Sequence, residues 1–214
     1  MGIAHARRPP AVVGTTSTLI MTDMFSRGLA ILMVAGVLTG CQMSKTGSPR
    51  SKSPPEPGLA RGVRNNCYSL LYDLLKQESH IGLLRFIKRE DDDLKKLMRK
   101  IADHSSAGAK LLEEFAAQDE SISLTDIWLP QGEEATRQAI ADLTRKELMD
   151  RSGEKFEVTL LLSQNKALGY AAQLAIVGAE HDLQTERSQA LKNLGRELDV
   201  LRQETFQMLL AKPR

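Results

Sequence analysis

Residues 93–118 read DLKKLMRKIADHSSAGAKLLEEFAAQ, and this stretch contains the pattern that decides the fold. Apolar or small residues recur in it at every seventh position. They are Leu94, Ile101, Gly108 and Phe115. Heptad spacing is typical of a helix that packs its apolar seam against partner helices. The stretch therefore predicts a long core helix in an all-α fold.

The composition agrees with a helical body. Hydrophobic residues make up 42% of the 214 residues but aromatic residues only 4%, so the core must consist of Leu, Ile, Ala and Met side chains. Basic residues are not concentrated: residues 41–64 hold five Lys or Arg and one Glu, whereas the rest of the body is slightly acidic. A nucleic-acid partner is not expected, because binding phosphates needs a concentrated basic face.

Four more helices are predicted around this one. Asn65 or Asn66 can cap a first helix, and the acidic run EDDD at residues 90–93 can cap the second. The expected ranges of the others are 67–89 for the first helix, 132–150 for the third, 154–179 for the fourth and 182–210 for the fifth. Trp128, in the irregular stretch 119–130, is expected to plug one end of the helical body.

The connections between these helices predict their order in space. The first and second helices, and the fourth and fifth, are joined by short turns, so each pair should form an antiparallel hairpin. The third helix, at 1.5 Å per residue, would span about 28 Å, which suits a crossover along the body. Two hairpins joined by a crossover describe a ferritin-like four-helix bundle, predicted for residues 65–214.

The amino-terminal region has the features of a targeting signal. The apolar run GLAILMVAGV at residues 28–37 is too short to span a bilayer, so residues 1–40 are predicted to be a cleaved signal peptide. This signal could begin at Met21 or Met24 as well as at Met1.

The following LTGC, residues 38–41, resembles the bacterial lipobox. The resemblance implies that Cys41 is acylated, with diacylglycerol and a fatty acid such as palmitate, and that it begins the mature protein. Gln42 in the next position favours the outer membrane. Pro, Ser and Gly dominate the rest of residues 41–64, which predicts a flexible tether between the lipid and the helical body.

Short motifs in the body resemble a known family. In order they are ESHIG (78–82), DDLK (92–95), DHSS (103–106), LP (129–130) and SGEKFE (152–157). Their order and spacing are similar to those of the ferritin-like family called domain of unknown function 4142, found in bacterial envelope proteins. The resemblance implies a helical bundle and an envelope location but no particular reaction.

The chain departs from the family at three positions. Two family histidines fall on Ser105, one place after His104, and on Leu168, and Leu160 replaces a family aromatic residue. If those histidines bind metal in relatives, this departure implies that the present chain has lost the site.

The residues themselves indicate no metal, cofactor or catalytic centre. A di-iron bundle needs Glu-x-x-His motifs, but Gln77, Ile101 and Gly178 stand three places before the histidines of the body. Zinc ligands at helical spacing, a Gly-x-Ser-x-Gly elbow and a phosphate-binding loop are also absent from the sequence. Cys67 is expected to be a small buried hydrophobic residue.

One polar pair is singled out. Glu78 and His104 lie 13 residues on either side of residue 91, so they should stand at one height on antiparallel helices. A hydrogen bond that fixes helix register is the main interpretation, and a metal-binding or proton-handling role is the alternative.

These observations favour a membrane-anchored lipoprotein of the cell envelope with a non-catalytic bundle that contacts an unidentified envelope protein. Two alternatives stay open. One is a metal-binding or redox-stress bundle in which Glu197 joins Glu78 and His104. The other is a lipoprotein that associates with itself.

Overall fold

The computed structural model describes residues 57–81 and 91–212. This part of the chain contains five helices and no strands, which confirms the all-α prediction for the residues described. The predicted signal peptide, Cys41 and residues 42–56 lie outside them. The helices are α2 (Pro57–Glu78), α3 (Asp92–Gln118), α4 (Gln131–Asp150), α5 (Gly153–Glu180) and α6 (Thr185–Leu210).

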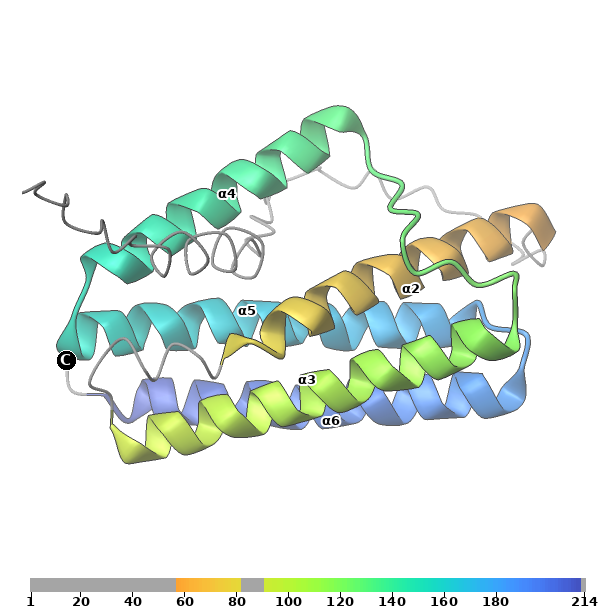
Figure 1. Ribbon diagram of the computed structural model, residues 1–214. Helices are drawn as coiled ribbons and strands as arrows, with labels where there is room; N and C mark the ends of the chain where they lie inside the picture. The colour runs from red at the N-terminus through yellow and green to blue at the C-terminus, as the bar shows by residue number, and fades with distance from the viewer. Residues whose placement is uncertain (1–56, 82–90, 213–214) are drawn as a thin grey trace, which may run out of the picture.

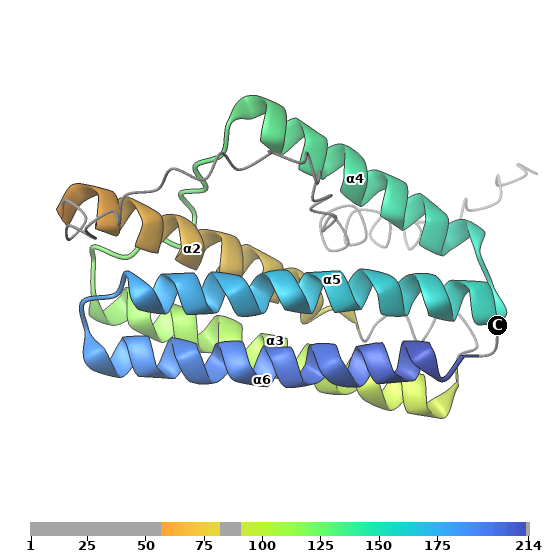
Figure 2. The same ribbon diagram turned by 180° about the vertical axis from the view of Figure 1, so that it is seen from behind.

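Four of the helices lie alongside one another in a bundle-like body (Figure 1). The contact between α5 and α6 is the most extensive, followed by those of α2 with α5 and α2 with α3. Helix α4 begins apart from the other helices and runs obliquely back along the body to the start of α5, as both views show (Figure 2). The α5–α6 connection and the beginning of the α3–α4 connection lie at the same end as the first turn of α2, and the α3–α4 connection then runs back over α2 to the start of α4.

The heptad seam of α3 is buried as predicted. All four of its seam residues are in the core, together with Leu97 and Leu112. Asp91 caps this helix, because its Oδ1 accepts the backbone N–H of Asp93 at 2.9 Å, and two more acidic residues follow in the first turn. Negative charge there interacts favourably with the helix dipole.

The first helix begins earlier than predicted. Residues 57–64, assigned above to the tether, form the opening turns of α2. Pro57 suits the first helical position. The backbone N–H of a residue there would have no partner within the helix, so no hydrogen bond is lost because proline lacks this group. Arg64 is buried and donates to the carbonyl of Ser121, 57 residues along the chain. The Pro- and Gly-rich composition that suggests a linker is thus overridden by a distant contact.

The first helix also ends earlier than predicted. It stops at Glu78. Just beyond this point, Ser79 Oγ and the His80 ring both bond to the carbonyl oxygen of Lys76. These side-chain bonds take the place of the backbone bond that this oxygen would accept if the helix continued. The predicted continuation over residues 82–89 lies outside the described residues.

Trp128 does not plug the end of the body. Its side chain is 79% exposed, because Asn66 Oδ1 accepts its backbone N–H at 3.0 Å and holds the α3–α4 connection on the outside of α2. The core at this end is closed by Tyr68, Phe115 and Ile122.

Within the described part of the chain, no helix combines the length and the apolar character needed to cross a membrane.

Helices α5 and α6 approach closely where Gly195 faces Ala172. A Cβ atom on Gly195 would lie 3.2 Å from the carbonyl oxygen of Ala172. This oxygen belongs to the helix backbone, so it cannot rotate away as the end of a flexible side chain could. We expect Gly195→Ala to lower the free energy of unfolding by about 1–3 kcal/mol, measured by urea denaturation. Gly62→Ala is the matched control, because nothing lies within 4 Å of its Cβ and it should gain about 0.5–1 kcal/mol. Stabilisation by both changes would contradict the close packing.

Candidate functional site

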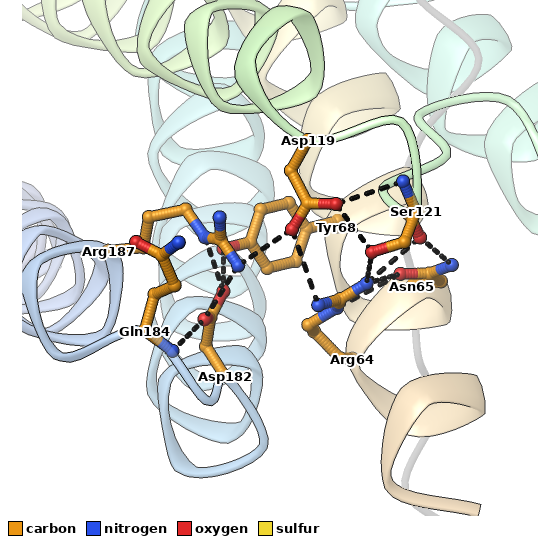
Figure 3. A network of polar contacts seen from close by, with 8 residues as sticks. All are labelled: Arg64, Asn65, Tyr68, Asp119, Ser121, Asp182, Gln184 and Arg187. Carbon is orange, nitrogen blue, oxygen red and sulfur yellow. Dashed lines mark hydrogen bonds and ion pairs between the residues drawn. The ribbon is translucent and has the colours of Figure 1, made fainter. Parts of the chain in front are cut away.

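A buried network of charged and polar side chains joins three parts of the chain at one end of the body (Figure 3). Arg64 and Tyr68 come from α2, Asp119 is the C-cap of α3, and Asp182 and Arg187 come from the α5–α6 connection and the first turn of α6. Two guanidinium groups thus face two carboxylates, so the charges of the network balance.

Asp182 is the centre of the network. Its fully buried carboxylate accepts bonds from Arg187 Nε at 3.0 Å and Nη2 at 3.1 Å, from Tyr68 Oη at 2.6 Å and from the Gln184 N–H at 2.8 Å. Burial raises the pKa of Asp182, but the bonds from Arg187, Tyr68 and Gln184 outweigh it and hold the pKa below its ordinary value. The group is therefore an ionised and saturated acceptor at neutral pH.

Asp119 connects the two arginines. One carboxylate oxygen lies 3.0 Å from Arg187 Nη2 and 4.0 Å from Arg64 Nη1, and the other accepts from the Ser121 hydroxyl and N–H. These two bonds from Ser121 are the main cause of its lowered pKa, and the charges of the arginines add to them.

The α3–α4 connection is fastened to α2 by side chains. Arg64 and Asn65 both donate to the Ser121 carbonyl, at 2.9 and 2.8 Å, and Ser69 Oγ donates to the Ser123 carbonyl at 2.9 Å. Each donor projects from α2, so the helix and the connection form one unit.

The chemistry that this network supports is stabilisation. Both carboxylates are ionised and engaged, and the pKa of the Tyr68 phenol is raised well above its ordinary value by burial and by its bond to Asp182. None of these three groups is poised to exchange a proton near neutral pH.

Sequence reasoning missed the network, although one signal pointed to it. Arg187 stands four places before Leu191 and is buried like it, so a charge occupies a core position of α6. A buried charge in a seam requires a partner. The partners Asp119 and Asp182 lie in connections, where a periodic pattern carries no information.

The predicted pair of Glu78 and His104 is not formed. The described residues show no ion pair or hydrogen bond between them: the His104 ring lies 2.9 Å from the Lys100 carbonyl oxygen, and the carboxyl of Glu78 meets Gln164 of α5. Standing at the same height is not sufficient for a contact between two side chains. Because the direction of a side chain rotates by about 100° with each residue of a helix, two residues at one height can point in different directions. Ser105, the next residue of α3, is fully buried instead.

Glu78 is a buried carboxyl without a full set of partners. Its Oε2 has no hydrogen-bond partner, and neither has Oε1 of Gln164. Burial raises the pKa of Glu78 to about 7, with the contact from Gln164 acting in the opposite direction. Glu78 therefore titrates near neutrality while enclosed in the body.

Other residues considered as ligands lie apart. Glu197 is exposed on α6, and Cys67 is free and buried, as expected, with its pKa raised to about 11 by burial. In residues 57–81 and 91–212, no three His, Cys, Asp or Glu side chains gather closely enough to hold a metal ion.

Comparisons of the chain with protein-family models, with curated proteins and with solved structures found no match. The family resemblance suggested by the short motifs stays a prediction.

Proposed function

We propose that this protein is a lipoprotein of the bacterial cell envelope, anchored by acyl groups on Cys41 to the periplasmic face of the outer membrane. Its helical body, a ferritin-like bundle, acts through contacts with another envelope protein and not through catalysis.

The observation that carries this proposal is the LTGC sequence directly after the apolar run of residues 28–37. A single acyl chain holds a protein only weakly on a membrane, whereas two or more hold it firmly, so a multiply acylated Cys41 would be a stable anchor.

Features of the body support the ferritin-like part of the proposal. Helices α5 and α6 form one closely packed pair, α2 and α3 are in contact, and α4 connects the two pairs along the length of the body. The polar network at one end stabilises this arrangement with saturated groups. Such a rigid body suits a binding role.

Membrane attachment tests the proposal through Cys41. We expect Cys41→Ser to remove the protein from the membrane fraction and to abolish incorporation of labelled palmitate, because the serine hydroxyl is not a substrate for lipid transfer to a thiol. Cys67→Ala is the matched control, since Cys67 is buried in the body and should not carry lipid. Equal palmitate labelling of the wild type and Cys41→Ser would contradict the anchor.

A further inference from the structure

Three buried side-chain oxygens inside the helical body have no hydrogen-bond partner among the residues that the structure describes. They are Glu78 Oε2 on α2, Ser105 Oγ on α3 and Gln164 Oε1 on α5. The three side chains belong to residues that are 7%, 0% and 3% exposed, so bulk water does not reach these atoms. Buried polar atoms of folded proteins nearly always have a partner, so this group of three needs an explanation.

The packing of the three helices brings these oxygens together, since the side chains of Glu78 and Gln164 are in contact. Helices α2 and α3 run antiparallel (Figure 1), and a Cβ atom on Gly108 of α3 would lie 3.0 Å from Cδ1 of Leu75 on α2. Glu78 follows Leu75 by three residues, about one turn along the same face of α2. Ser105 precedes Gly108 by three residues, which is one turn toward the same end of the body. Ser105 therefore faces Glu78 beside Gln164.

The three groups together offer fewer hydrogen-bond donors than acceptors. Gln164 Oε1 only accepts, Glu78 Oε2 only accepts when the carboxyl is ionised, and the Ser105 hydroxyl donates one hydrogen. Because one hydrogen cannot satisfy two acceptors, a direct contact among the three leaves an acceptor without a donor. A water molecule matches this need, since it donates to both acceptors and accepts from the serine. A protonated Glu78 would donate to the same water, so the match holds in both states of the carboxyl.

We propose that an internal water molecule binds between Glu78 Oε2, Ser105 Oγ and Gln164 Oε1 and connects helices α2, α3 and α5. Internal waters typically make about three hydrogen bonds to buried polar groups that lack other partners. A divalent cation fits the site poorly, because calcium and magnesium take about six or more oxygen ligands and Glu78 supplies the one carboxylate among these three groups. The proposal does not depend on the lipid anchor, because all three residues lie in the helical body.

A crystal structure of the protein at a resolution that shows ordered water tests the site. We expect a solvent peak at about 2.5–3.0 Å from each of the three oxygens. Oxygen-17 relaxation dispersion in solution should detect the same water, because it exchanges slowly with the bulk solvent. The double variant Glu78→Leu with Gln164→Leu removes two of the three partners, so both the peak and its contribution to the dispersion should be lost.

Ser163→Ala is the matched control. Ser163 is also buried on α5, but its hydroxyl already donates to the Leu160 carbonyl at 2.8 Å, so this variant should keep the water.

Two results for the wild type would overturn the proposal, whether or not the double variant folds. One is a map in which the three side chains bond to one another with no solvent peak between them. The other is a peak with about six oxygen ligands at about 2.0–2.6 Å, which would identify a metal ion. An unchanged dispersion in a folded double variant would also contradict the site.

Discussion

Asp182→Ala is expected to lower the free energy of unfolding by about 3–5 kcal/mol, the range for breaking a buried ion pair by removal of one partner. The change leaves the Tyr68 hydroxyl without its acceptor and removes the two-point contact of Arg187, whose side chain stays buried. Guanidinium denaturation followed by circular dichroism at neutral pH measures the effect.

Asp199→Ala is the matched control for this prediction. Asp199 pairs with Arg202 on the surface of α6, 2.7 Å from its Nε, with both side chains partly exposed. Exposed pairs of this kind contribute about 0–1 kcal/mol. If the two variants lost the same stability, the network would not have the structural role assigned to it.

Glu78→Gln is expected to stabilise the protein above neutral pH. Because the pKa of Glu78 is raised from 4.5 in an unfolded chain to about 7 in the fold, the native state binds its proton more tightly. The stability that this proton contributes is fully present below pH 4.5 and is lost as the pH rises through 7. The loss approaches about 3 kcal/mol for a shift of this size.

The amide in Glu78→Gln keeps the shape of the protonated carboxyl and can donate to the unpartnered Oε1 of Gln164. Urea denaturation between pH 4.5 and 8 should therefore show a much smaller fall of stability for this variant than for the wild type. Glu197→Gln, which changes an exposed carboxylate, should keep the wild-type slope. A wild-type slope in Glu78→Gln would show that Glu78 is solvated and not enclosed.

The periodic parts of the fold were predictable because the spacing of apolar residues indicates which side of each helix is buried. The seam of α3 is buried as its heptads predict, and the limits of α3 to α6 lie within a few residues of those expected. The start of α2 was not predictable, since its first turns are rich in Pro and Gly and are held by Arg64 through a contact 57 residues away.

The polar sites were less accessible to sequence reasoning. Glu78 was singled out from the sequence, but its contact with Gln164 depends on how α5 is rotated against α2, which the spacing of residues along the chain does not give. The exposure of Trp128 likewise depends on one side chain, Asn66, that binds the backbone of a connection. An aromatic residue in an irregular stretch gives no indication of which side it will face.

The most direct test of the account is mass spectrometry of the protein extracted from bacterial membranes. The account predicts a mature chain that begins at Cys41 and carries a diacylglyceryl group and an amide-linked fatty acid on that residue. A peptide that runs unbroken across residues 40 and 41, or an unmodified Cys41 in the membrane-derived protein, would contradict it.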